Sequence, residues 1–372
     1  MKVLHICNGA QGYSPFYKHL FQALKRKEVK QSLLVPVWKT PNIDFEDIEC
    51  EYFYRDSGIL ARLRFLRKIK KLTTFALEKF DVTKYDVIHA HTWFSDGAVA
   101  YNLHKKYGIP YIVAVRNTDI NIFYKYFIHL RKLGHSILEN AYQIIFIAPA
   151  YKNYVINELL PQKIINEITD KLSVIPNGVS SFWLNQKQQK TKLLHPVRIL
   201  SAGAITPNKN HLALCRVIES LRKRGVEIEL TIVGKGYKDA PRYLKKLENY
   251  IKNKPHITLV EKQNQEELLQ TFRNHNIFVL PSHTETFGLV YIEALTQGLP
   301  IVYTKDQGID GYFKYGEIGY AVNPKNTEEI SQAIVSIISK HKTLSDNITQ
   351  LDFSIFDWEK IAERYLEIYC SC

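Results

Sequence analysis

The sequence predicts an α/β protein made of two tandem halves, each with a parallel β-sheet covered by helices. Short apolar runs, typical of buried strands, alternate with longer stretches of helical periodicity along the whole chain. The 372 residues suffice for two domains. The composition, 45% hydrophobic and 23% charged, is that of a globular protein and excludes a mostly disordered chain.

The first half begins with a predicted strand over 2–7, followed by Gly9 and Gly12. Ser14 and Pro15 then begin a helix, because serine is a good N-cap and proline is tolerated at the first helical position. Further strands are predicted at 32–37, 86–91, 111–115 and 143–148.

The second half repeats this order. Strands are predicted at 197–203, 229–234, 256–260, 277–281 and 300–304, and helices at about 208–224, 240–253, 265–275 and 287–297. The turn residues 176–178 suggest the boundary, which gives domains over 1–178 and 179–355 and a final helix over 356–372. Ligands of such sheets bind beyond the carboxyl ends of the strands, so we expect the site in a cleft between the two sheets.

The net charge is +13, from 50 Lys and Arg against 37 Asp and Glu. It indicates an acidic partner such as a phosphorylated substrate, an anionic lipid or nucleic acid. The five cysteines include no C-x-x-C pair, as expected for a reducing cytosol. No apolar run approaches the ~20 residues of a transmembrane helix, and the N-terminus is a poor signal peptide. We therefore expect a cytoplasmic chain that contacts a membrane only peripherally.

The most informative segment is PSHTETFGLVYIEALTQGLP at 281–300. A helix is predicted to start near Phe287 and to end at Gly298, so its first N–H groups form an anion site suited to a diphosphate. Glu285 lies just before that site and Glu293 eight residues later. Carboxylates accept hydrogen bonds from hydroxyls, which fits a ribose and a sugar. Two ordinary surface glutamates explain the spacing equally well.

The block E-T-F-G-L-V-Y-I-E-A-L, with seven residues between Glu285 and Glu293, resembles the E-x7-E signature of retaining glycosyltransferases, and more narrowly that of glycosyltransferase family 4. DVIHAH, SVIPNGV, SAGAITPNKN and IVGKG occur in that family's order, so the similarity covers nearly the whole chain. It implies the GT-B fold, in which two Rossmann-like domains face a central cleft and the C-terminal helix crosses back to the N-terminal domain. Trp358 would anchor that crossing.

The resemblance also implies functions for single residues. Glu285 would contact the donor sugar, Glu293 would accept hydrogen bonds from the ribose, and Lys209 would neutralise the diphosphate leaving group. The backbone amides that bind the diphosphate and the sugar would be those of Thr286, Phe287, Gly288 and Leu289. Many members carry an arginine where this chain has Ala204. One usual cation is therefore missing, and Lys235 is a candidate to replace it.

In the N-terminal half, the resemblance places a flexible glycine loop at Gly12, near the donor phosphates and the acceptor. His91 would point toward the cleft near the reacting sugar, whereas His89, on the same strand face, is expected to be structural. Asp119 matches an acceptor-side aspartate, although the family often has a histidine where Arg116 stands. The G-x-G-x-x-G fingerprint is absent, which argues against a dehydrogenase.

A basic segment, RLRFLRKIKK at 62–71, has six basic residues and no acidic one. It is interpreted as an amphipathic helix, and FYKYFIHLRK at 123–132 adds aromatic and basic side chains. The apolar positions of the helix are Leu60, Leu63, Leu66 and Ile69. An anionic lipid surface and a solvated helix face explain the segment equally well. No module that reads nucleic acid is visible.

Together these features predict a retaining glycosyltransferase that moves a sugar from a nucleoside-diphosphate sugar, of UDP or GDP type, to a glycan or lipid-linked acceptor. Bacterial surface polysaccharide biosynthesis is the expected setting. No further cofactor and no metal are expected, because Lys209 and helix N–H groups can stabilise the diphosphate and the D-x-D motif is absent. A sugar-nucleotide epimerase of the same fold and a non-catalytic sugar-nucleotide or glycan-binding protein remain as alternatives.

Overall fold

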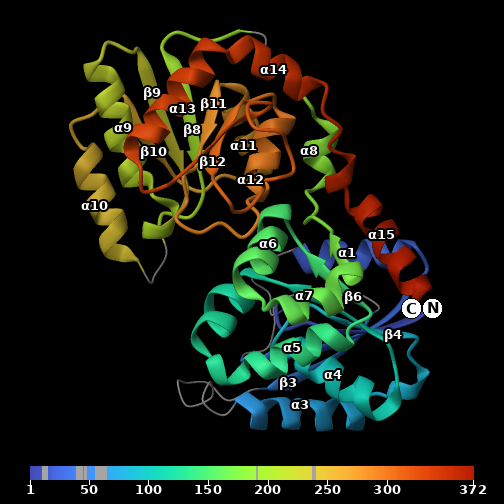
Figure 1. The fold of residues 1–372 in the computed structure, drawn as a ribbon. Coiled ribbons are helices and arrows are strands. Elements are labelled where there is room, and N and C mark those ends of the chain that lie inside the picture. The colour runs from blue at the N-terminus through green and yellow to red at the C-terminus, as the bar shows by residue number, and fades with distance from the viewer. Residues whose placement is uncertain (11–15, 39–44, 46–47, 55–64, 190–191, 237–239) are drawn as a thin grey trace. The chain divides into compact units, whose positions relative to one another are not determined.

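The computed structural model describes residues 1–372 except 11–15, 39–44, 46–47, 55–64, 190–191 and 237–239. The chain divides into two compact units (Figure 1). The first comprises Met1–Ile147, Lys152–Gly178 and Ile355–Cys372, and the second comprises Ala148–Tyr151 and Val179–Ser354. Each unit contains one parallel sheet with helices packed against it, which confirms the predicted fold class.

The sheet of the first unit has the order β3-β2-β1-β4-β5-β6-β7. Its strands are β1 (Lys2–Ile6), β2 (Lys30–Val37), β3 (Glu49–Tyr54), β4 (Val87–Ala90), β5 (Tyr111–Val115), β6 (Gln143–Phe146) and β7 (Leu172–Val174). The helices of this unit include α1 (Phe16–Arg26), α3 (Phe65–Lys79), α4 (Ser95–Tyr107), α5 (Arg131–Asn140), α7 (Gln162–Ile168) and α15 (Trp358–Ser371). The strand order reverses between β1 and β4, so polar residues at their carboxyl ends lie side by side.

The second unit has the order β10-β9-β8-β11-β12-β13, which reverses between β8 and β11. Its strands are β8 (Val197–Ala202), β9 (Ile228–Val233), β10 (Ile257–Val260), β11 (Ile277–Val279), β12 (Ile301–Thr304) and β13 (Gly319–Val322). Its helices include α8 (Ser181–Asn185), α9 (His211–Lys223), α10 (Pro241–Ile251), α11 (Gln265–Arg273), α12 (Leu289–Thr296), α13 (Thr327–Ser339) and α14 (His341–Thr349). A short helix, α6 (Pro149–Tyr154), spans the division between the units. In open α/β sheets of this kind, the point of reversal is where ligands bind.

The C-terminal helix α15 packs against α1 in the first unit, as the GT-B fold requires (Figure 1). Asp357 caps its N-terminus, and Trp358 lies in the core of that unit. A Cβ atom on Gly178 would lie 2.5 Å from the Trp358 indole, so only glycine allows this close packing. On the outer side, Arg26 forms an ion pair with Glu359. The C-terminal helix therefore completes the core of the N-terminal unit.

Helix α3 confirms a helix in the basic segment and the burial of Ile69, but the assignment of Leu66 to the apolar face is wrong. Leu66 is 62% exposed although it was assigned to that face, and Leu60 and Leu63 lie outside the described residues. On a helix of 3.6 residues per turn, residues spaced by three fall about 60° short of a full turn. Apolar residues with that spacing therefore do not stay on one face of the helix. The buried positions are Phe65, Ile69, Leu72 and Ala76.

Candidate active site

Two loops meet at the carboxyl edge of the second sheet, where the strand order reverses. One follows β8 and carries Lys209, and the other follows β11 and carries Glu285. The side-chain amide of Asn208 joins them, because it accepts from the Thr284 N–H at 2.9 Å and donates to the Thr284 carbonyl at 2.8 Å. The His283 N–H donates to the Asn208 carbonyl at 2.7 Å. Residues about 76 positions apart in sequence are thereby fixed next to each other.

Lys209 and Glu285 form an ion pair at this point. Nζ of Lys209 lies 2.6 Å from Oε2 of Glu285, and the two side chains are only 20% and 9% exposed. The same carboxylate accepts from the Ser282 hydroxyl at 3.2 Å and from the Thr286 N–H at 3.2 Å. A partly shielded cation and a carboxylate therefore lie side by side where a ligand would bind.

The backbone of Glu285 is fixed by two residues that the sequence analysis did not identify. The Gln307 side chain accepts from the Glu285 N–H at 2.8 Å, and the Tyr151 hydroxyl donates to the Glu285 carbonyl at 2.6 Å. Gly308 has φ +60°, and a Cβ atom there would lie 2.9 Å from the Phe287 carbonyl oxygen. Neither Tyr151 nor Gln307 belongs to a motif, so only the fold shows that they support this loop.

Helix α12 begins at Leu289, two residues later than predicted. Gly288 precedes it with φ +81°, where a Cβ atom would lie 2.4 Å from the Tyr291 ring, so this position requires glycine. Among the described residues, no acceptor bonds to the N–H groups of Gly288 and Leu289, and the first N–H groups of a helix have no partner within it. The Thr286 N–H, by contrast, is already bonded to Glu285. The Phe287 side chain is buried, so only its backbone could contact a ligand.

Glu293 lies one turn into α12 with a partly buried side chain. In the part of the chain that the structure describes, its carboxylate has no hydrogen-bond partner. Burial raises the pKa of Glu293 to about 7. A buried carboxylate without a partner costs stability and is what a site for a ligand hydroxyl requires.

Ala204 offers no charge, but a cation lies on the neighbouring strand end. The Lys235 carbonyl accepts from the Ile205 N–H at 3.0 Å, so the backbone of Lys235 lies next to the loop that carries Ala204. The Lys235 side chain is exposed. Gly12, assigned to the glycine loop of the first unit, lies outside the described residues.

Asp119 has a buried and fully occupied carboxylate in the first unit. It accepts hydrogen bonds from the N–H groups of Trp93 at 3.0 Å, Phe94 at 3.1 Å and Arg116 at 2.9 Å. Burial raises the pKa of Asp119 to about 6, and these three hydrogen bonds oppose the rise. In this structure Asp119 fixes the loop after β4, so any influence on an acceptor is through that loop.

His91 was expected to point toward a cleft, but its ring is wholly buried. Nε2 of His91 lies 3.1 Å from Nδ1 of His5, and its ring packs edge-on against Tyr17. His89 shares the same strand face, and its ring stacks on that of His91 with centroids 3.9 Å apart. The expectation failed because this sheet face lies under α1 and α15 up to the end of β4.

Asp96, at the start of α4, is a further buried carboxylate that the sequence analysis missed. It accepts from the Asn8 N–H at 3.2 Å, and burial raises its pKa to about 7. It therefore ties the residue after β1 to the helix after β4. An aspartate at a helix start is an ordinary capping choice, so nothing in the sequence singled it out.

Two family models match the chain in succession. Residues 14–181 match Glycosyltransferase Family 4, and residues 184–350 match Glycosyl transferases group 1. The chain is a GT-B glycosyltransferase. The Lys209–Glu285 pair and α12 lie in the group 1 half of this glycosyltransferase, and the buried histidines lie in the family 4 half.

Sequence relatives include other glycosyltransferases. An uncharacterized glycosyltransferase of Methanocaldococcus jannaschii is 25% identical over 305 residues, which cover 77% of this chain and 76% of the relative. A D-inositol 3-phosphate glycosyltransferase of Paenarthrobacter aurescens is 26% identical over 308 residues, covering 77% of this chain and 72% of the relative.

Solved structures with the same fold cover the whole glycosyltransferase. Sucrose-phosphate synthase from Thermosynechococcus elongatus superposes with a TM-score of 0.74 at 18% identity, over 100% of this chain and 98% of its own. HepE from Anabaena in complex with UDP and glucose superposes with a TM-score of 0.70 at 18% identity, over 100% of both chains.

Replacing Glu293 by Gln in this glycosyltransferase is expected to stabilise the fold at pH 8. The carboxyl has a folded-state pKa of about 7, above its ordinary value of 4.5, so the free energy of unfolding falls as the pH rises from 4.5 through 7. Glutamine does not ionise, so the variant avoids this loss of unfolding free energy, which is on the order of 1–3 kcal/mol at pH 8. The gain in stability over the unaltered chain shrinks toward pH 5. Urea unfolding at both pH values measures it, with exposed Glu248→Gln as the control. An equal gain at both pH values would contradict the buried-carboxyl account.

Proposed function

We propose that the chain is a retaining, metal-independent glycosyltransferase that transfers a sugar from a nucleoside-diphosphate sugar to a glycan or lipid-linked acceptor. The observation that carries the proposal is the Lys209–Glu285 pair beside the open N-terminus of α12. Bacterial surface polysaccharide biosynthesis is the process that such an acceptor suggests. The enzyme would work in the cytoplasm, on the inner face of the membrane.

Each group at this site has a task in the transfer. When the bond between the anomeric carbon and the diphosphate breaks, negative charge grows on the leaving phosphate. The Lys209 ammonium and the N–H groups of Gly288 and Leu289 stabilise that charge, which other enzymes achieve with a divalent metal. Glu285 accepts hydrogen bonds from the sugar and Glu293 from the ribose. The resemblance of the E-x7-E block supports retention of configuration.

The donor is proposed to be of UDP or GDP type. The HepE structure contains UDP and glucose, which makes UDP the first nucleotide to test. Lys235 supplies the second positive charge that Ala204 does not. In the first unit, Asp119 acts on the acceptor side by positioning the loop after β4.

A thermal-shift screen with UDP, GDP and ADP tests the donor site. A nucleotide at about 100 times its Kd adds about 2.7 kcal/mol of stability, which raises the Tm by several degrees. Glu293→Ala should abolish the shift and the exposed Glu248→Ala should not. With the matching sugar nucleotide, turnover should require an acceptor. Epimerisation or hydrolysis of the donor without any acceptor would contradict the proposal.

We further propose that the first unit binds anionic membranes through a patch formed by Leu66, Tyr126 and Ile128 with the cations around them. These three side chains are 62%, 68% and 66% exposed. A ring contact of 5.6 Å between Phe65 and Phe123 brings α3 and the segment after β5 together. The neighbouring exposed cations are Arg67, Lys70, Lys71 and Lys125.

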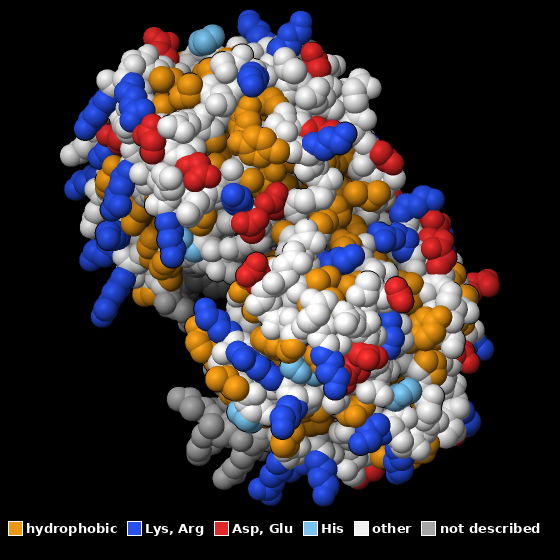
Figure 2. Space-filling model, in the orientation of Figure 1, with side chains coloured by type: hydrophobic (Ala, Val, Ile, Leu, Met, Phe, Trp, Pro, Cys, Tyr) orange, Lys and Arg blue, Asp and Glu red, His pale blue; other side chains and the backbone are white. Residues whose placement is uncertain are grey.

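The charge distribution supports this assignment. Residues 1–180 contain 25 of the 50 basic residues but only 16 of the 37 acidic ones. Basic and hydrophobic side chains lie together at the α3 end of the first unit (Figure 2). Among the described residues no helix is long and apolar enough to cross a bilayer. Exposed apolar side chains beside cations suit insertion into the headgroup region of an anionic surface.

Changing Arg67, Lys70 and Lys71 to Gln is expected to weaken binding to anionic vesicles by one to two orders of magnitude, because each cation near such a surface contributes about 1 kcal/mol. Co-sedimentation with phosphatidylserine vesicles and with neutral vesicles measures it at low and high salt. The matched control changes Lys245, Lys246 and Lys252, three exposed lysines of the second unit. Equal loss in both variants, or no preference for anionic vesicles, would leave the segment a solvated helix face.

A further inference from the structure

Arg116 is a partly buried cation at the carboxyl edge of the first sheet, directly after β5. Its Nε donates to the His91 carbonyl at 3.3 Å, so the guanidinium lies at the end of the neighbouring strand β4. Its Nη1 donates to Oδ1 of Asn177 at 3.4 Å, and its guanidinium carbon lies 5.8 Å from the centre of the Phe16 ring. Both hydrogen bonds are long, and they use two of the five N–H groups of a guanidinium.

The positive charge of Arg116 is not balanced by a bound carboxylate. Among the residues that the structure describes, no Asp or Glu forms an ion pair with the guanidinium. Asp119 bonds instead to the backbone N–H of Arg116 at 2.9 Å, and its other bonds are to the N–H groups of Trp93 and Phe94. A cation that is shielded from water without an anion costs stability. A ligand that carries a negative charge would remove this cost.

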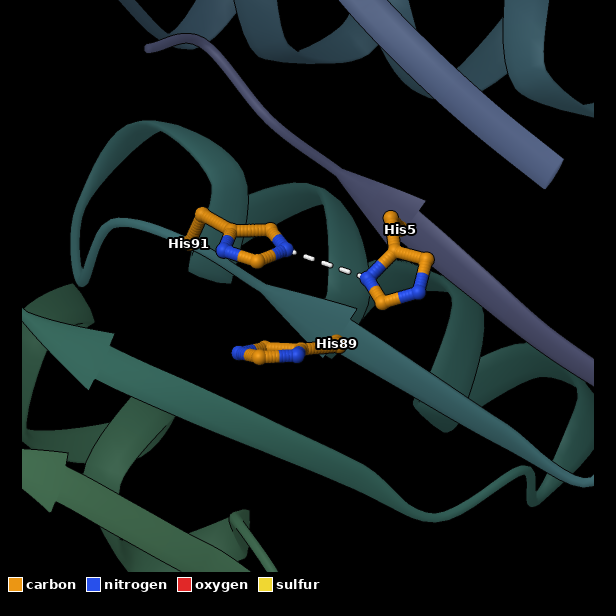
Figure 3. Close-up of side chains that lie close together, drawn as sticks. All are labelled: His5, His89 and His91. Atoms are coloured by element: carbon orange, nitrogen blue, oxygen red, sulfur yellow. Dashed lines mark hydrogen bonds between the residues drawn. The ribbon is translucent and has the colours of Figure 1, made fainter. Parts of the chain in front are cut away.

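The histidines of the two adjoining strands supply no negative charge either. Figure 3 shows the imidazoles of His5 and His91 facing each other, with His89 beneath His91. All three side chains are wholly buried. Burial lowers the pKa of His5 to about 3 and keeps the pKa of His89 and His91 well below 6.5, so the rings are neutral. A ligand at this edge would meet the partly exposed Arg116 rather than these rings.

We infer that Arg116 binds an acidic group of the acceptor, a phosphate or a carboxylate, an assignment that rests on the function proposed above. A guanidinium binds either group through two parallel N–H groups. The described chain leaves both N–H groups of Nη2 and one of Nη1 unused. Ligands of open α/β sheets bind at the carboxyl ends of the strands, where Arg116 lies. The acceptor is therefore an acidic glycan or a sugar joined to a phosphate, and a neutral sugar would bind weakly.

The test is calorimetry with four small probes, namely inorganic phosphate, glucose 6-phosphate, glucuronate and glucose, in the presence of excess UDP to fill the donor site. The unaltered chain should bind at least one acidic probe at least 10-fold more tightly than glucose. Arg116→Gln should weaken that binding by about 10–100-fold, the usual loss when hydrogen bonds to a charged group are removed. Arg116→Lys should recover only part of it, because an ammonium lacks the planar pair of N–H groups.

The controls separate this site from the donor site. Arg216→Gln, which changes an exposed arginine of the second unit, and Lys209→Ala should both keep the affinity for the acidic probe. Circular dichroism shows whether each variant folds, and Arg116→Gln should bind UDP as the unaltered chain does. Loss of UDP affinity in Arg116→Gln would assign Arg116 to the donor and overturn the inference. So would equal binding of glucose and the acidic probes, or unchanged binding in Arg116→Gln. Failure of every nucleotide to bind would instead contradict the proposed function.

Discussion

Lys209→Ala is expected to lower kcat/KM by roughly 10²–10³-fold or more, the usual cost of removing a group that stabilises transition-state charge. The loss should be at the high end because Ala204 provides no second cation in the same loop. Glu285 keeps its contacts with Ser282 and Thr286 in this variant, so the fold should persist. Steady-state release of the nucleoside diphosphate measures the effect.

Two further variants make this result specific to Lys209. Lys245→Ala removes an exposed lysine of α10 and should leave turnover unchanged. Ala204→Arg should be tolerated or should tighten donor binding, because it adds a charge next to Ile205 and Lys235. If Lys209→Ala keeps most of its activity, another cation neutralises the diphosphate, and Lys235→Ala becomes the decisive variant.

Glu285→Gln is expected to lower turnover by about 10²-fold or more without weakening the binding of the nucleoside diphosphate. The carboxylate lies 2.6 Å from the Lys209 ammonium, so it competes with a phosphate for that cation. Removing its charge frees Lys209, and the diphosphate should bind equally well or a few-fold more tightly. Glu293→Ala should do the opposite and weaken binding, because its carboxylate has no competing partner.

Calorimetry with the nucleoside diphosphate alone separates the two glutamates. Glu285→Asp serves as a control that keeps the charge but shortens the reach, and should slow turnover without the gain in affinity. Equal loss of affinity in Glu285→Gln and Glu293→Ala would show that the division of tasks between them is wrong.

The fold could be predicted from the sequence because its strands are continuous apolar runs between helices. Ten strands follow from that pattern, whereas β3, β7 and β13 do not, and the return of the C-terminal helix was implied by the family resemblance. β7 is a three-residue strand that contains Ser173, and β13 begins at Gly319, so neither is a continuous apolar run. β3 lies at the edge of the sheet, and its Glu49 and Glu51 interrupt the apolar run.

The candidate site was predicted only where residues lie within one motif. Glu285, Gly288 and Glu293 lie in one segment, and Lys209 was added by the family resemblance. Tyr151 and Gln307 could not be found because their side chains contact backbone atoms of Glu285, and such contacts leave no pattern in the sequence. His91 is the opposite case, a residue that the sequence analysis assigned to the site and that the structure buries. A histidine at a strand end has the same sequence context whether or not helices cover that face of the sheet.

The central claim is that a sugar leaves a nucleoside diphosphate and is joined to an acceptor hydroxyl with its anomeric configuration kept. Proton NMR of the anomeric signal in the first product tests it most directly, with an α-configured UDP-sugar or GDP-sugar as donor and the coupling constant as the readout. The account predicts an α-linked product, formed by the unaltered chain and at a strongly reduced rate by Glu285→Gln. A β-linked product would contradict it.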